Sequence, residues 1–444
     1  MSTYHKLVED QREYYQSGAT RPLAARKEIL YQLKQFFIDN KRALDDAIYT
    51  DLHKTPSKLS EADIMVQYEI DEVLAKMDEW EKPEKHPLLL EHFNENEDDV
   101  WLVREPLGVV LIISCWNYPL LTSAPFVTAI AAGNTVVIKP SELSPTSSSL
   151  FAKLINKTFD KRLLTVIEGS DHETTELLKE RWDFIGYTGN PAAGKIVMAA
   201  AARHLTPVTL ALGGKNPVYI DEDADLEGAA KTIVQFKTAN CGQNSLSVDY
   251  ILTDEKTKPA LLEVLKAEIV KMEPFRTNPS YARIGHESQF DRISNLLSKT
   301  KGRTYYRPNE ANDRADRFIP VHLLEIDYDD AFMTEEIFGP ILVVLTVESF
   351  DKAIDFIKRG EKPLGAYIFT KDPEKTRRFI RETSSGGITV NSVLMHATLP
   401  HLPAGGVGNS GMGKMHDIWT YDSMSHKKIV FTRNGIGKKL PASL

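Results

Sequence analysis

The sequence predicts an α/β fold in which helices cover both faces of a parallel sheet. Short runs rich in apolar and β-branched residues occupy positions 108–114, 135–140, 163–169 and 184–189. Helix-length segments separate these runs, and strands that alternate with helices form parallel sheets that are buried on both faces. Because ligands bind such sheets at the carboxyl ends of the strands, the residues that directly follow each run are the first candidates for a site.

Helices are predicted before the first of these strands. Apolar residues recur at helical spacing in two segments, with Ile29, Leu33 and Phe36 in the first and Ile70 and Met77 in the second. The stretch HFNENEDDVWLVREP then places an acidic turn between two extended segments, which predicts a hairpin. A further alternation of strands and helices begins near residue 207 and continues to about residue 400, so we expect a second α/β domain.

Composition and charge narrow the range of partners. The chain has 444 residues and a net charge of −8, whereas a nucleic-acid-binding face must be basic, so nucleic acid is not expected as a partner. We expect no signal peptide, because the first residues are polar, and no membrane span, because no apolar run reaches about 18 residues. The two cysteines fit a reducing compartment and lack the spacing of metal ligands, so we expect a cytoplasmic protein without a metal site.

Polar residues and glycines follow the predicted strands. Lys139 and Glu142 suit the hydroxyls of a ribose, although a solvated loop would explain them as well. The amide of Asn117 could stabilise an oxyanion, or it could belong to an ordinary turn before proline. Gly189 and Gly194 lie where a strand passes into a helix, which is a place for a phosphate, although their spacing also fits a plain tight turn.

Taken in order, several stretches resemble the aldehyde dehydrogenase superfamily, and most closely its class 3 branch, the fatty and aromatic aldehyde dehydrogenases. The resemblance extends from roughly residue 20 to residue 430 and rests on EPLGVVLIISCWNYP, AAGNTVVIKPSE, ETTELLKERWDFIGYTGN, GKIVMAAAARHLTPVTLALGGKNP, NCGQNSLSVDYIL, MTEEIFGPIL, EKPLGAYIF, ETSSGGITVN and GGVGNSGMG. It implies a Rossmann-type NAD(P) domain, an α/β catalytic domain and an oligomerisation arm that joins two subunits into a homodimer. The family reaction is the NAD(P)-dependent oxidation of aldehydes to acids.

This resemblance implies a division of the chain into regions. The order is N-terminal helices that join the cofactor domain, an arm hairpin, the NAD(P)-binding domain, the catalytic α/β domain and a C-terminal arm or tail, at residues 1–82, 83–106, 107–210, 211–404 and 405–444. The boundary near residue 211 follows from the position of the motifs, because no low-complexity linker marks it.

The resemblance also implies a site for NAD or NADP. Lys139 and Glu142 match the positions that contact the adenosine ribose. Thr188, Gly189 and Gly194 match the turn beneath the pyrophosphate.

Further positions match the reacting end of the cofactor. Glu336 matches the contact to the nicotinamide ribose, and Phe338 matches its packing neighbour. Asn117 matches the oxyanion donor, and Asn391 matches a structural asparagine of the catalytic loop.

Two positions depart from the family pattern. The family uses a cysteine thiolate to attack the aldehyde and a glutamate to activate the water that releases the acid, and these positions are Ser245 and Ala211 here. A thiol with a pKa of about 8.5 is partly ionised at neutral pH, whereas a serine hydroxyl needs a positioned base. We therefore expect an aldehyde dehydrogenase family protein whose catalysis is impaired or absent, a pseudoenzyme that binds NAD(P) and an aldehyde or aldehyde-like ligand.

Two alternatives remain open at this point. Another thiol could carry the reaction, with Cys241 ahead of Cys115, or the fold could serve as a structural or storage protein. His204 and His396 are expected to be ordinary polar residues and not bases.

Two further departures concern the substrate end of the site. Gly186 and Ala404 stand where the class 3 branch commonly has larger residues. The space for the substrate is therefore expected to be wider.

Overall fold

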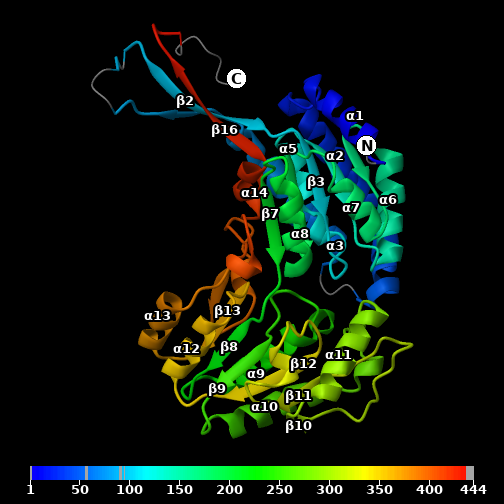
Figure 1. Ribbon diagram of the computed structural model, residues 1–444, viewed down its shortest axis with the longest axis vertical. Coiled ribbons are helices and arrows are strands. Elements are labelled where there is room, and N and C mark those ends of the chain that lie inside the picture. The colour runs from blue at the N-terminus through cyan, green and yellow to red at the C-terminus, as the bar shows by residue number, and fades with distance from the viewer. Residues whose placement is uncertain (1–2, 56–58, 90–92, 95, 437–444) are drawn as a thin grey trace.

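The computed structural model describes residues 3–55, 59–89, 93–94 and 96–436, and three β-sheets organise them (Figure 1). A six-stranded sheet lies between a seven-stranded sheet and a small three-stranded sheet that projects as an arm. The α/β fold predicted from the sequence is confirmed. Among the described residues, no helix is long and apolar enough to span a membrane.

The six-stranded sheet contains the strands that the apolar runs predict. Its order is β15-β7-β6-β3-β4-β5, and all neighbours are parallel except β15. The strands are β3 (Val109–Ile113), β4 (Thr135–Lys139), β5 (Leu164–Val166), β6 (Phe184–Gly189), β7 (Val208–Leu212) and β15 (Gly411–Met412). Each of the predicted runs therefore holds a strand.

Helices bury both faces of this sheet, which explains why its central strands are apolar on both sides. Val110 and Ile112 of β3 face a cluster with helices α2 and α5, whereas Val109 and Leu111 face a cluster with α1, α7 and α8. These helices are α1 (His5–Gln16), α2 (Leu23–Leu52), α5 (Pro125–Ala131), α6 (Pro145–Thr158), α7 (Asp171–Leu177) and α8 (Pro191–Ala202).

The N-terminal helices pack as the apolar spacing predicts. Leu33, Phe36, Ile70 and Met77 are buried, and Ile29 is half-buried beside them. The second helical segment contains a π-helical turn that the spacing did not predict. It divides into α3 (Glu61–Ile64), the π-helix η1 (Met65–Ile70) and α4 (Asp71–Trp80).

The seven-stranded sheet forms the other large layer. Its order is β10-β11-β12-β9-β8-β13-β14, with only β10 antiparallel to its neighbour. The strands are β8 (Pro217–Ile220), β9 (Tyr250–Thr253), β10 (Arg303–Tyr306), β11 (His322–Glu325), β12 (Ile341–Thr346), β13 (Gly365–Phe369) and β14 (Gly387–Val390).

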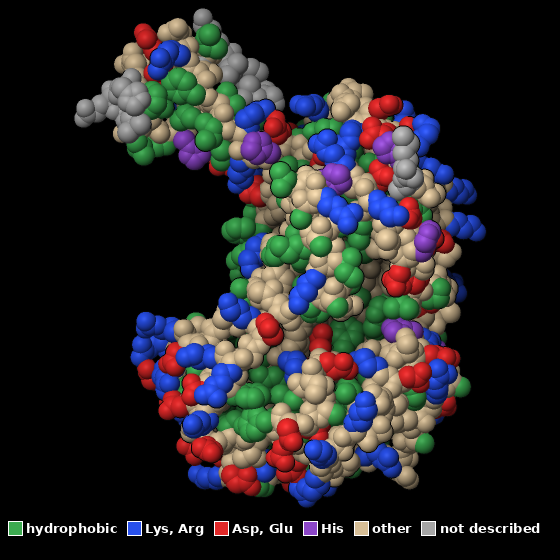
Figure 2. Space-filling view, in the orientation of Figure 1, with side chains coloured by type: hydrophobic (Ala, Val, Ile, Leu, Met, Phe, Trp, Pro, Cys, Tyr) green, Lys and Arg blue, Asp and Glu red, His purple; other side chains and the backbone are tan. Residues whose placement is uncertain are grey.

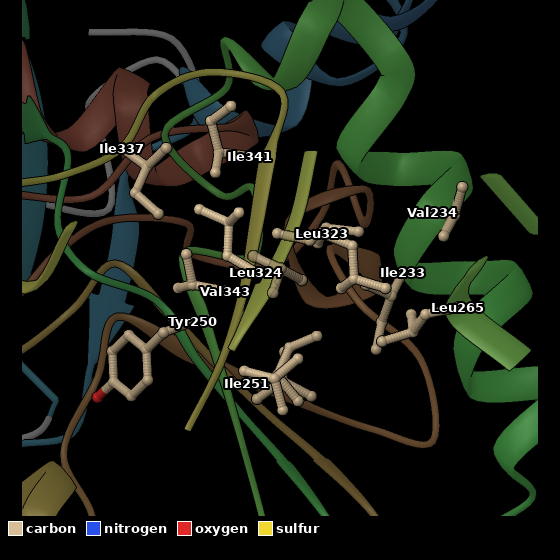
Figure 3. Close-up of a cluster of buried hydrophobic side chains, with 14 of the residues drawn as sticks. Ile233, Val234, Tyr250, Ile251, Leu265, Leu323, Leu324, Ile337, Ile341 and Val343 are labelled. Atoms are coloured by element: carbon tan, nitrogen blue, oxygen red, sulfur yellow. The ribbon is translucent and has the colours of Figure 1, made fainter. Parts of the chain in front are cut away.

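A core of aliphatic and aromatic side chains fills this layer. Ile251, Leu324 and Val343, from three adjacent strands, lie near its centre (Figure 3). The helices that cover the sheet are α9 (Leu226–Thr238), α10 (Lys258–Val270), α11 (Glu287–Lys299), α12 (Phe350–Arg359) and α13 (Pro373–Glu382). The chain passes from the first sheet to the second between Leu212 and Pro217, close to the predicted boundary.

The arm is an antiparallel sheet in the order β1-β2-β16, built from β1 (Glu84–His86), β2 (Asp99–Pro106) and β16 (Ser425–Thr432). It extends away from the rest of the molecule (Figure 1). Before reaching the arm, the C-terminal segment adds β15 to the six-stranded sheet and packs α14 (Asp417–Ser423) on α5. Residues 405–424 thus belong to the body of the molecule.

Candidate active site

The loop that follows α9 has an unusual backbone. Asn240, Cys241 and Gly242 have φ angles of 50°, 56° and 71°, in the left-handed region that most residues avoid. A Cβ atom at Gly242 would overlap the carbonyl oxygen of Gly339, so only glycine fits there. The close approach joins this loop to the segment that carries Glu336 and Phe338.

Side-chain amides hold the loop in place. The Nδ2 of Asn117 donates to the carbonyl oxygen of Gln243 at 3.0 Å, and the Nδ2 of Asn240 donates to the carbonyl oxygen of Asn117 at 2.9 Å. From the other side, the Nδ2 of Asn216 donates to the carbonyl oxygen of Ser245 at 2.8 Å. The structure thus brings Asn117 against the loop that carries Ser245, although the two residues are distant in the sequence.

Ser245 is half-buried at the end of this loop. Within the described part of the chain, no carboxylate or imidazole forms a hydrogen bond with its hydroxyl group. A serine without such a partner remains protonated and is a weak nucleophile.

Ala211 lies on β7 of the six-stranded sheet. It pairs with Thr188 of β6 on one side and with Gly411 of β15 on the other. Its methyl group is half-buried and cannot accept a proton. The position therefore offers no general base.

Glu336 lies close to the strand that carries Ala211. A Cβ atom at Gly213 would overlap its carboxyl group, and the backbone N–H of Gly214 donates to it. Burial, with the charge of Asp249 nearby, raises the pKa of Glu336 to about 8. This carboxyl group is thus mostly protonated at neutral pH, and the sequence did not indicate its contact with Gly213.

The candidate cofactor residues gather at the carboxyl edge of the six-stranded sheet. Lys139, at the end of β4, is 2% exposed, and its Nζ donates to the carbonyl oxygen of Pro140 at 2.7 Å. The Oε2 of the exposed Glu142 lies 3.5 Å from the same nitrogen. Burial lowers the pKa of Lys139, and the charge of Glu142 partly opposes this.

The turn between β6 and α8 brings a helix N-terminus to the same edge. The Asn190 side chain accepts a hydrogen bond from the N–H of Ala193 and so caps α8. A Cβ atom at Gly189 would overlap the Tyr187 hydroxyl, and one at Gly194 would lie 2.8 Å from a methyl carbon of Leu212. The two glycines therefore let the turn and the helix approach the sheet closely, a shape that fits a dinucleotide phosphate.

Aromatic packing links the two sides of the site. The rings of Trp116 and Phe338 meet edge to face, with centroids 5.5 Å apart, and Trp116 makes a similar contact with His286 at 5.0 Å. Neither Trp116 nor His286 was predicted from the sequence. The position of Trp116 directly before Asn117 was the only local signal, and nothing local marked His286.

The two thiols do not offer a nucleophile. Cys241 is 0% exposed within the core of the seven-stranded sheet, and burial raises its pKa to about 12. Burial likewise raises the pKa of Cys115 to about 11. Both thiols are therefore protonated at neutral pH, and Cys241 is closed off from any ligand.

The two histidines differ in their surroundings. His396 shares a hydrogen bond of 2.8 Å with the hydroxyl of Thr389, and His204 is exposed at the end of α8. Asn391 binds the backbone of Thr370 through both ends of its side-chain amide, at 2.9 and 3.0 Å. His396 and Asn391 thus have partners within the fold.

Comparisons with known proteins show which family the chain resembles. The model of the aldehyde dehydrogenase family matches residues 2–430. The chain is 42% identical over 442 residues to the mouse aldehyde dehydrogenase described as dimeric and NADP-preferring, a match that covers 98% of this chain and 95% of that protein. It is 43% identical over 428 residues to aldehyde dehydrogenase family 3 member A2 of Macaca fascicularis, which covers 95% and 86%.

A solved structure agrees with these relatives. The substrate-bound state of Staphylococcus aureus AldH superimposes with a TM-score of 0.92 at 36% identity, over 98% of this chain and 94% of that one. Since both the sequence and the fold match over nearly the whole length, the chain belongs to the aldehyde dehydrogenase family.

Proposed function

We propose that this protein binds NAD or NADP together with an aldehyde or aldehyde-like ligand, and oxidises aldehydes only at a rate near background. One observation carries the proposal: the loop around Ser245 keeps a strained and hydrogen-bonded shape, while Ser245 and Ala211 stand where the family has its nucleophile and its base. A loop that only linked two elements would have no need of three consecutive left-handed residues.

The missing nucleophile has no replacement nearby. The Ser245 hydroxyl needs a base to lose its proton, and Ala211 cannot be that base. Glu336 is mostly protonated at neutral pH, because its pKa is raised to about 8. General-base catalysis typically contributes about 10²–10⁴-fold, so losing both the thiol and the base leaves little activity.

The cofactor proposal rests on the carboxyl edge of the six-stranded sheet. Lys139 and Glu142 would hold the adenosine ribose, and the turn at Thr188, Gly189 and Gly194 would receive the pyrophosphate. Glu336 and Phe338 would lie at the nicotinamide end. When bound, the cofactor accepts the hydride in the family reaction. The name of the mouse relative states a preference for NADP.

We propose that the arm joins two copies into a homodimer. Strand β16 is an edge strand among the described residues, and its Ile429 and Phe431 are 74% and 42% exposed. Hydrophobic side chains are visible on the surface of the arm (Figure 2). An exposed edge strand with apolar side chains favours pairing with a partner, and the name of the mouse relative describes it as dimeric.

We also propose that the protein is cytoplasmic. Its cysteines are free in the described structure, as expected of a reducing compartment.

The proposal is tested by the formation of reduced nicotinamide. The parent and the Ala211→Glu/Ser245→Cys double variant are compared with NAD and NADP over a panel of aliphatic and aromatic aldehydes. Turnover is expected only in the double variant. Turnover of the parent at a comparable rate would contradict the proposal, and Cys241→Ala and Cys115→Ala variants would then show whether a thiol is responsible.

A structural or storage role remains the second candidate, and a binding measurement separates it. Equilibrium titration of the parent with NAD and NADP is expected to show saturable binding. A storage protein would need no cofactor, so the absence of binding to either dinucleotide would favour that role.

A further inference from the structure

His286 belongs to a contact between the layers of the two large sheets. Its ring meets Trp116 edge to face, and Trp116 in turn meets Phe338, which the proposed function puts at the nicotinamide end. A Cβ atom at Gly285 would overlap the ring of Trp116, so the glycine lets the indole rest against the backbone. Trp116 follows β3 of the six-stranded sheet, whereas Gly285 and His286 precede α11 of the other layer. The contact therefore spans the boundary between the layers.

The hydrogen bonds of His286 decide which ring nitrogen carries its proton. Nδ1 accepts the backbone N–H of Gln289 at 3.2 Å, which caps α11, and it lies 2.7 Å from the hydroxyl oxygen of Ser288. Burial and the charges of Arg317 and Arg292 lower the pKa of His286, so the ring is neutral at neutral pH. Since Nδ1 is an acceptor, the proton of the neutral ring resides on Nε2. His286 thus presents Nε2–H as a donor.

This donor is free to meet a ligand. Among the described residues, none forms a hydrogen bond with the Nε2 of His286. The nitrogen is also not sealed inside the protein, in contrast to the Nε2 of His322, which is buried without a partner in the seven-stranded sheet. Polar groups at such depth normally have a partner, so a half-buried donor without one suits a ligand that brings an acceptor.

The charges around His286 indicate which part of a dinucleotide lies beside it. The charge of Glu142, at the proposed adenosine-ribose end, acts on both His286 and Cys115. Cys115 directly precedes Trp116, and the charge of Glu336, at the proposed nicotinamide end, acts on it as well. The segment under His286 therefore lies between the two ribose ends, and the group that joins the two riboses of a dinucleotide is its pyrophosphate.

We propose that the Nε2–H of His286 donates a hydrogen bond to the pyrophosphate of NAD or NADP from the side of the seven-stranded sheet. The inference rests on the proposed cofactor site and adds a contact from the other layer of the molecule. The guanidinium group of Arg317 donates to two carbonyl oxygens and forms no ion pair within the described ranges, so its charge near His286 favours an anion. A charged phosphate oxygen also accepts a stronger hydrogen bond than a ribose hydroxyl does.

The test is equilibrium titration of the full-length protein with ADP, which carries the pyrophosphate without the nicotinamide. His286→Asn keeps a side chain that can cap α11 but is shorter than the imidazole, and His286→Phe keeps an aromatic ring against Trp116 without a donor. Both variants are expected to bind ADP about tenfold more weakly, the loss expected of one charge-assisted hydrogen bond. His204→Asn, at the exposed end of α8, is the matched control and should bind ADP as the parent does.

Nuclear magnetic resonance of the imidazole nitrogens distinguishes a direct contact from a structural effect. In protein with isotope-labelled histidine, saturating ADP is expected to shift the Nε2 resonance of His286, which is identified by its loss in His286→Asn. The resonance of His204 should not shift. A parent that binds neither ADP nor NAD would overturn the proposed cofactor site and this inference with it. A parent that binds ADP, with both His286 variants binding it equally well or with an unchanged Nε2 resonance, would overturn this inference alone.

Discussion

The carboxyl edge of the six-stranded sheet and the loop after α9 differ in what they retain. The edge keeps both its shape and the side chains expected to contact a ligand, with Lys139 buried at the end of β4 and Gly189 at the end of β6. The loop keeps its shape but presents Ser245. Asn240, Gly242 and Asn117 hold the backbone frame of this loop and none of them stands at the nucleophile position, so under the proposed function the frame of the loop and its reactivity are separable.

The largest loss of stability is expected at Gly242, where the backbone of the loop is most tightly packed. Gly242→Ala places a Cβ atom on the carbonyl oxygen of Gly339 at a residue with a φ of 71°, so the protein should lose about 3 kcal/mol of stability. Denaturant unfolding measures the loss. Gly360→Ala is the control, since a Cβ atom there would meet nothing closer than 3.5 Å. Equal stability of the two variants would mean that the frame is not held as described.

A smaller effect is expected at Glu336, where the two regions meet. Its folded-state pKa is raised to about 8, so the folded protein binds more protons than the unfolded chain between about pH 4.5 and 8. The stability associated with the protonated carboxyl is fully present below pH 4.5 and is lost progressively as the pH rises to and through 8. Glu336→Gln should flatten this part of the stability–pH curve, and parallel curves for parent and variant would contradict the assignment.

The smallest effect in free energy is expected at the cofactor edge. Lys139→Met should weaken NAD or NADP binding about tenfold, as the loss of a charge-assisted hydrogen bond would. Stability should not fall, because burial already disfavours the charged Lys139, as its lowered pKa indicates. Lys153→Met changes an exposed lysine of α6 and serves as the control in the same fluorescence titration. Unchanged affinity in Lys139→Met would remove this residue from the proposed site.

Much of the fold could be predicted, because short-range signals carry it. The apolar runs of β3, β4 and β6 are buried on both faces, and buried parallel strands show this pattern in the sequence. The loop of Ser245 was located through the stretch NCGQNSLSVDYIL, which resembles the family pattern, and its left-handed backbone at residues 240–242 became visible only in the structure.

Contacts between distant segments could not be predicted. Nothing in the sequence near Glu336 or Gly213 indicates that the carboxyl group of one fills the space left by the other. The burial of Cys241 depends on the core of a whole sheet, and its position close to Ser245 in the sequence suggested more access than the structure allows. Such features arise from tertiary packing, which local spacing does not encode.

The central claim is that the loop after α9 has the backbone geometry and hydrogen bonds of a catalytic loop, although its Ser245 is not an effective nucleophile. The single variant Ser245→Cys tests this claim most directly. We would mix this variant with aldehyde and NAD or NADP and follow reduced nicotinamide from the first seconds. The account predicts a burst of about one reduced nicotinamide per site followed by slow turnover, because a thiol is restored while Ala211 still provides no base to release the acid. A variant as silent as the parent, despite measurable cofactor binding, would contradict the claim that the frame is intact.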